Sequence, residues 1–241
     1  MSVNPHNRMS VTIKARSRKA IVIGGSLLIA SGALFFLFPQ IDLAFSKIFF
    51  RNEIGIDGRP IGFWLNDHPA LNAFFVAVDW VARAILLGLI ILLIYRLIRR
   101  HQHVLSTAII TISLVVGPLL MVNTVFKDHW DRARPREVEH FGGEKKFSPP
   151  WIISDQCEKN CSFTSGHAAA GFAFVVLYFV GHSAAWLWLG ITAGLTIGVT
   201  RVAVGAHFLS DVVFSFFAVY LSAAVIAWAF ASLSRGLLKR N

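Results

Sequence analysis

Charged residues are scarce in this chain, and acidic residues are the scarcer kind. Asp and Glu together number 13, and charged residues make up 15% of the 241 residues, whereas 55% are hydrophobic. The mean hydropathy of +0.61 excludes an ordinary soluble domain. The sequence also lacks internal repeats and low-complexity segments, so we expect residues 1–241 to form a single domain.

Six long hydrophobic runs account for most of this apolar character. A helix needs about 20 apolar residues to cross the roughly 30 Å hydrocarbon core of a bilayer. The runs cover residues 20–38, 72–95, 104–126, 166–183, 185–204 and 208–232. The first run is longer than the core of a typical signal peptide and no clear cleavage site follows it. The sequence therefore predicts an all-α integral membrane protein with six transmembrane helices in one bundle, embedded in a lipid bilayer.

The net charge of +10 is unevenly distributed along the chain. Eleven of the 23 Lys and Arg residues lie in the tail 1–19, the connection 96–103 and the end 233–241, which contain no Asp or Glu. All three segments fall on one side of a six-helix topology, and positive charge marks the cytoplasmic side. We therefore expect both termini in the cytoplasm and an external loop over 127–165. The charge reflects this topology, so no nucleic-acid partner is expected.

Cysteine is rare as well. The two cysteines, Cys157 and Cys161, both lie in the predicted external loop. Disulfides persist outside the cytoplasm, so we expect these two residues to form one. Two cysteines alone make a poor ligand set for a metal ion, so a metal site is not expected here.

Two segments allow more than one interpretation. The second run contains Asp79 and Arg83, and charges at membrane depth are costly and usually paired or functional. Their spacing of four residues favours an ion pair between them, with a role in lining a substrate pocket as the alternative. Residues 41–50 have apolar side chains at helical spacing and either lie flat in the outer interface or simply extend the packing of the first helix.

Polar residues stand where four of the runs begin or end on the external side. Lys127 follows the third run, His167 begins the fourth, Arg201 lies near the end of the fifth, and His207 precedes the sixth. Lys127, Arg134 and Arg201 are cations, and guanidinium groups match the oxygens of a phosphate group. We therefore expect a phosphate site at the external mouth of the bundle.

Two histidines in this set have the chemistry of phosphoryl transfer. Asp211 lies four residues after His207, on the same helix face, and a carboxylate can orient an imidazole as a nucleophile. His167 is available as a general acid. Ser165, Gly166 and His167 open a helix, where free N–H groups attract anions. The pattern predicts transfer through an enzyme-bound phosphohistidine.

No nucleotide-binding glycine loop and no evident carboxylate cluster accompany these residues. We therefore expect a reaction without a metal ion or another cofactor. Several nearby polar residues are assigned to a solvated loop. These are Asp128, His129, Asp131, Arg132, Arg136 and His140.

The motifs Lys127-x6-Arg134-Pro135, Ser165-Gly166-His167 and Arg201-x5-His207-x3-Asp211 resemble the signature of the type-2 phosphatidic acid phosphatase superfamily. The resemblance implies that His207 is the nucleophile, Asp211 its partner and His167 the acid. It also implies a set of phosphate-binding residues, namely Lys127, Arg134, Ser165, Gly166 and Arg201. Thr164 and Thr200 depart from the family pattern, which has proline and serine there.

The resemblance implies a phosphatase that acts on a lipid phosphomonoester or diphosphate at the periplasmic side of a bacterial inner membrane. The loop pattern GG-x3-F-x-P followed by C-x3-C-S-F-x-S-G-H is similar to members that dephosphorylate lipid A. Lipid A is therefore the first candidate substrate, ahead of undecaprenyl diphosphate and phosphatidylglycerophosphate. A lipid phosphotransferase and a non-enzymatic lipid sensor or transporter are alternatives. No obligate protein partner is expected.

Overall fold

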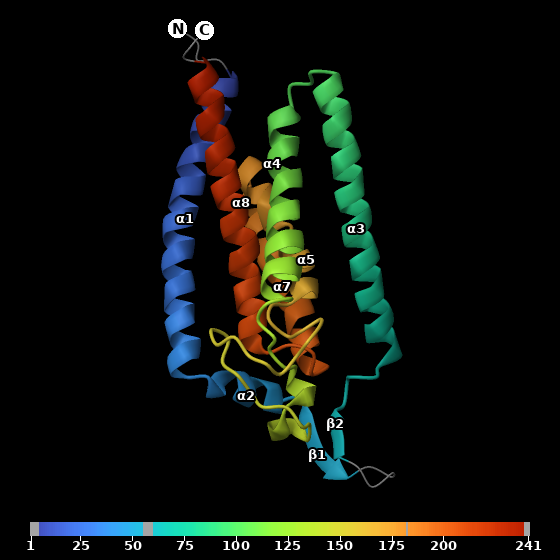
Figure 1. Cartoon of the computed structure of the whole chain (residues 1–241). Coiled ribbons are helices and arrows are strands. Elements are labelled where there is room, and N and C mark those ends of the chain that lie inside the picture. The colour runs from blue at the N-terminus through green and yellow to red at the C-terminus, as the bar shows by residue number, and fades with distance from the viewer. Residues whose placement is uncertain (1–4, 55–59, 182, 239–241) are drawn as a thin grey trace.

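Five long apolar helices run side by side in the computed structural model, which describes residues 5–54, 60–181 and 183–238 (Figure 1). They are α1 (Pro5–Leu37), α3 (Pro69–Ile98), α4 (Val104–Leu114) continued by the π-helix η1 (Val115–Phe126), α7 (Ala185–Ala203) and α8 (Leu209–Leu238). Each is long and apolar enough to cross a membrane. The prediction of a mainly helical membrane protein is therefore confirmed.

The fourth predicted span is shorter than the other five. The chain forms α5 (Gly166–Phe172) and α6 (Val175–Val180), and together they make an apolar segment shorter than a spanning helix. Phe172, Val175, Val176 and Phe179 of this segment are almost completely buried. The segment is apolar because it fills the interior of the bundle. Its hydropathy alone therefore could not show that its helices are shorter than a membrane-spanning helix.

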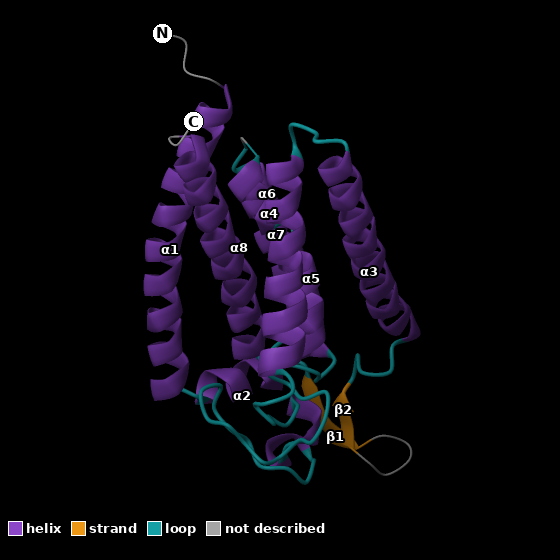
Figure 2. Cartoon of the chain, turned by 45° about the horizontal axis from the view of Figure 1, so that its top comes forward, coloured by secondary structure: helices purple, strands orange, loops and turns teal. Residues whose placement is uncertain are grey.

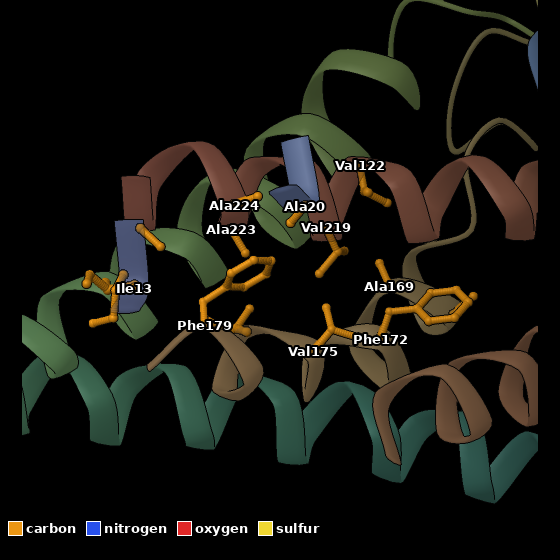
Figure 3. Close-up of a cluster of buried hydrophobic side chains, with 14 of the residues drawn as sticks. Ile13, Ala20, Val122, Ala169, Phe172, Val175, Phe179, Val219, Ala223 and Ala224 are labelled. Carbon is orange, nitrogen blue, oxygen red and sulfur yellow. The ribbon is translucent and has the colours of Figure 1, made fainter. Parts of the chain in front are cut away.

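The core lies between this short segment and α8. Figure 3 shows Phe172, Val175 and Phe179 in one cluster with Val219 and Ala223 of α8. Small side chains recur every four residues on α8 and allow neighbouring helices to approach closely. The completely buried positions with this spacing are Val219, Ala223, Ala227 and Ala231. α8 lies beside α1 along most of its length (Figures 1 and 2).

The predicted N-terminal tail is largely helical, because α1 begins at Pro5 rather than at residue 20. Arg16 explains part of this extension. Its guanidinium donates hydrogen bonds to the carbonyls of Tyr178 and Gly181, where α6 ends. Residues 1–4 of the predicted tail and the C-terminal cations Lys239 and Arg240 lie outside the described residues.

The longest connecting segments lie at the end of the bundle opposite the two termini, which we call the loop end (Figure 2). There α2 (Gln40–Lys47) runs across the bundle, so residues 41–50 do not continue the first helix (Figure 1). A hairpin of β1 (Phe50–Ile54) and β2 (Pro60–Phe63) follows. This small sheet is a departure from the all-α prediction. The loop after η1 contains two 3-10 turns, η2 (Pro135–Glu137) and η3 (Glu139–Phe141).

Candidate active site

The residues of the three motifs meet at the loop end. Lys127 directly follows η1, Arg134 precedes η2, Ser165 is the N-cap of α5, and Arg201 lies in the last turn of α7. The remaining members are His167 in the first turn of α5, His207 just before α8 and Asp211 in the first turn of α8. The structure therefore brings together side chains that are up to 84 residues apart, since 211 − 127 = 84.

His207 is buried and held in one tautomer. Its Nδ1 lies 2.7 Å from the backbone carbonyl oxygen of Ser162, and only 1% of the residue is exposed. A carbonyl only accepts hydrogen bonds, so Nδ1 carries the proton and Nε2 keeps its lone pair. Burial lowers the pKa of His207 to about 3, and nearby Arg201 adds to this effect. The imidazole is therefore neutral at neutral pH, as a nucleophile must be.

Asp211 contacts His207 less directly than the sequence pattern predicts. Its Oδ2 lies 3.7 Å from Nδ1 of His207. The same oxygen accepts hydrogen bonds from the hydroxyl of Ser162 and, at 2.7 Å, from the backbone N–H of Phe208. Asp211 thus fixes Ser162, whose carbonyl in turn orients His207. Ser162 was missed because a serine in a polar loop carries no distinctive signal.

The assignment of Arg132 to a solvated loop is wrong. Its side chain is completely buried, with Nη1 2.5 Å from Oδ1 of Asp211 and Nη2 2.8 Å from Oδ2 of Asp42 in α2. Asp42 also accepts a hydrogen bond from the backbone N–H of Ser210 at 2.8 Å. A buried charge requires partners, and Arg132 has two carboxylates. The loop folds back over the bundle, which the sequence of the loop does not reveal.

Lys127, Arg134 and Arg201, which we call the cation cluster, concentrate positive charge beside His207. Burial and the nearby charges of Arg134 and Arg201 together lower the pKa of Lys127 to about 8. The guanidinium of Arg201 lies over the ring of Phe75 at 4.5 Å. Its buried Nε–H has no acceptor among the described residues. Like charges held together in this way favour an anionic ligand.

The pKa of Lys127 predicts a pH dependence of activity. Lys127 is charged below about pH 8 and loses its charge as the pH rises through that value. The value of kcat/KM reports the free enzyme, so it should fall above about pH 8. Arginine stays protonated, so Lys127→Arg should move this decline to higher pH. The measurement is kcat/KM from pH 6 to 10, with the exposed Lys146→Arg as control. An unchanged alkaline limb in Lys127→Arg would assign the decline to another group.

His167 contacts α3, and this contact corrects one prediction. Its Nε2 lies 3.5 Å from Oδ1 of Asp79, and its ring meets that of Phe75 edge to face at 5.2 Å. In the described part of the chain no ion pair joins Asp79 to Arg83, whose guanidinium lies 5.6 Å from the ring of Trp80 instead. The predicted pair is therefore wrong, because Asp79 faces α5. The pocket-lining alternative agrees with its position.

Gly166 packs closely against Asn123, a neighbour that the sequence did not single out. A Cβ at this position would lie 2.4 Å from Oδ1 of Asn123 in η1. The Asn123 amide donates to the carbonyl of Pro118 at 2.8 Å, within the π-helix η1. Ser165 caps α5 by accepting a hydrogen bond from the N–H of Ala168. The predicted helix start is therefore confirmed.

The predicted disulfide between Cys157 and Cys161 is present. It closes a turn directly before the segment that orients His207. Within this turn, the backbone carbonyl of Asn160 accepts a hydrogen bond from Nη2 of Arg134 at 2.6 Å. Directly after it, the backbone N–H of Ser162 donates to the backbone carbonyl of Arg132 at 2.8 Å. The disulfide therefore constrains the contact with Arg134 and the position of Ser162, whose carbonyl orients His207.

Reduction of the disulfide should lower activity severalfold, because the carbonyl of Ser162 would lose a fixed position. We expect dithiothreitol to have this effect on the wild-type protein. A Cys157→Ser/Cys161→Ser variant should be less active from the start and insensitive to dithiothreitol. Phosphate release with and without the reductant measures this. Equal sensitivity of both proteins would show that the disulfide is not responsible.

Comparison with known proteins agrees with this geometry. The profile of the PAP2 superfamily matches residues 106–235. The chain is 35% identical over 219 residues to a lipid A 4′-phosphatase of Francisella tularensis subsp. novicida, covering 87% of this chain and 95% of the relative. It is 32% identical over 225 residues to a lipid A 4′-phosphatase of Rhizobium leguminosarum, covering 84% and 91%. No solved structure matches the chain significantly.

The helical bundle, the cation cluster and these matches together define a membrane phosphatase, as the sequence predicted. The chain belongs to the PAP2 superfamily. Among the residues that the structure describes, no group of three or more His, Cys, Asp or Glu side chains could hold a metal ion. Metal independence stays a prediction, which inhibition by EDTA and rescue by Mg²⁺ would contradict.

Proposed function

We propose that this protein hydrolyses a phosphate monoester of lipid A by way of a phosphohistidine at His207. The reaction takes place at the periplasmic face of a bacterial inner membrane. The observation that carries the proposal is the buried His207, whose Nδ1 is held by the carbonyl of Ser162 beside the cation cluster. The curated relatives named lipid A 4′-phosphatase support the choice of substrate. The distribution of basic residues supports the sidedness.

In the first step, Nε2 of His207 attacks the phosphorus atom and the bond between phosphorus and the leaving oxygen breaks. In the free protein, burial lowers the pKa of His167 to about 4, and the negative charge of the bound phosphate raises it, so that His167 holds a proton when the reaction begins. His167 donates this proton to the leaving oxygen, and the lipid leaves as an alcohol. Lys127, Arg134 and Arg201 stabilise the charge on the three non-bridging oxygens, with the N–H group of Gly166 and the side-chain hydroxyl of Ser165. Asp79 orients His167 from α3.

In the second step, water attacks the phosphohistidine and the bond between phosphorus and nitrogen breaks. His167, now unprotonated, accepts the proton of the water, and inorganic phosphate is released. Asp211 and Ser162 hold His207 in the same tautomer throughout. The cycle returns both histidines to their initial protonation states.

A panel of lipids tests the proposal. Purified protein in detergent micelles should release one phosphate from lipid A, detected as the mass of the dephosphorylated lipid. Release should not depend on an added acceptor lipid, and vanadate should inhibit as a phosphate mimic. Faster hydrolysis of undecaprenyl diphosphate or phosphatidylglycerophosphate would contradict the substrate. Phosphate transfer that requires an acceptor would identify a phosphotransferase, and binding without release would contradict an enzyme.

A further inference from the structure

A second hollow at the loop end lies outside the three motifs. It has a volume of about 240 Å³ and opens between the β1–β2 hairpin and the segment that contains η2 and η3. Its lining includes Phe50, Phe63, Asn66, Asp67, Arg136 and Phe141. We call it the hairpin pocket. None of these residues belongs to the cation cluster or is one of the proposed catalytic groups.

The hairpin pocket adjoins the loop that carries His207. The backbone N–H of Arg136 donates to the carbonyl of Gly205 at 3.1 Å. Gly205 has a φ of +66°, and a Cβ there would lie 2.5 Å from the ring of Phe63. Two walls of the pocket therefore pack against a residue two positions before His207. The pKa of Arg134 is lowered by burial and also by the charge of Arg136, which lies close to it.

The polar wall of the pocket offers donors and acceptors side by side. Nη1 of Arg136 donates to Oδ1 of Asn66 at 2.8 Å, and Nδ2 of Asn66 donates to Oδ1 of Asp67 at 3.2 Å. A second anion would face the carboxylate of Asp67, which disfavours it. A neutral ligand with several hydroxyl groups matches a wall that both donates and accepts.

The apolar part of the pocket lining is aromatic. The rings of Phe50, Phe63 and Phe141 pack against one another with centroids 5.2 to 5.4 Å apart. An apolar wall that faces a few convergent polar groups is typical of a small-molecule site. The volume is below the roughly 300–1,000 Å³ of clefts that hold drug-sized ligands, which suits a single ring.

We propose that the hairpin pocket binds a sugar ring of the substrate headgroup while the cation cluster holds the phosphate. The inference rests on the proposed function, because lipid A carries its phosphate groups on a sugar backbone. The C–H face of the ring lies against the phenylalanines, and its hydroxyl groups bond to Arg136, Asn66 and Asp67. The pocket thus selects phosphorylated glycolipids over phosphates on simple lipids.

Two single variants and one control test this proposal. Asn66→Ala and Arg136→Ala should each raise KM for lipid A about five- to tenfold, which is the loss of a hydrogen bond or two, with little change in kcat. Inhibition by vanadate reports the phosphate site alone. The vanadate inhibition constant should stay within about twofold of wild type in Asn66→Ala, which changes no charge. Arg51→Ala, an exposed arginine on the same hairpin, should leave all three values unchanged.

The outcomes separate the two proposals. If the wild-type protein releases phosphate from lipid A and both variants keep its KM, the sugar pocket is overturned and the proposed function stands. If KM for lipid A and the vanadate constant rise in parallel in Asn66→Ala, the residue acts on the phosphate site and the sugar pocket is again overturned. If the wild-type protein leaves lipid A unchanged, the proposed function fails first and the inference fails with it.

Discussion

His207→Ala is expected to lower the rate of phosphate release from lipid A by at least about 10⁴-fold. The reason is that Nε2 of His207 is the proposed nucleophile, and the carbonyl of Ser162 holds the imidazole in position through Nδ1. Water attack on the bound lipid would remain, helped only by the cation cluster. Phosphate release and the melting temperature should be measured on the same preparation.

The side chain of His207 is buried, so truncation also removes packing. His207→Gln keeps more of the volume and still lacks a nucleophilic ring nitrogen, so it should be equally inactive and melt closer to wild type. His140→Ala, which replaces an exposed histidine in η3, is the matched control. Substantial turnover by a folded His207 variant would show that the phosphohistidine scheme is wrong.

Arg132→Met should have the largest effect on stability. The substitution leaves Asp42 and Asp211 buried without their shared cation, since both carboxylates bond to the Arg132 guanidinium. Removing one member of a buried ionic network costs about 3–5 kcal/mol. For a chain of this size that is a decrease in Tm of roughly 10 °C. Activity should fall as well, because Asp211 positions Ser162 and thereby His207.

A double variant tests whether the unpaired carboxylates cause the loss of stability. Arg132→Met combined with Asp42→Asn removes one of the two unpaired charges and should recover part of the lost Tm. Arg51→Met replaces an exposed arginine and should leave Tm within about 1 °C of wild type. A Tm of Arg132→Met equal to that of Arg51→Met would show that the buried network does not stabilise the fold.

The long helices could be predicted because a bilayer imposes a length and a composition that a single sequence displays. Five of the six hydrophobic runs form helices of spanning length. The remaining run, 166–183, forms α5 and α6 and is apolar for another reason, since it is buried in protein. Hydropathy measures the preference for an apolar environment and does not distinguish lipid from a protein core.

The placement of the motif residues could be predicted because topology assigns each helix end to one side of the bundle. The partners of these residues could not. Asp42 lies 90 residues before Arg132, and nothing local indicates that a turn of α2 reaches the loop. Asp79 and Arg83 illustrate the same limit, because their spacing allows a pair within α3 while packing turns Asp79 toward His167. Contacts between elements depend on tertiary packing.

The most direct test of the account is to trap the enzyme-bound intermediate. Lipid A carrying radioactive phosphate should be mixed with the protein, quenched rapidly and digested, and the labelled peptide sequenced. The account predicts a label that is stable to base and labile to acid, on the peptide that contains His207, and absent from His207→Ala. A label on serine or aspartate, or rapid turnover with no label on His207, would contradict it.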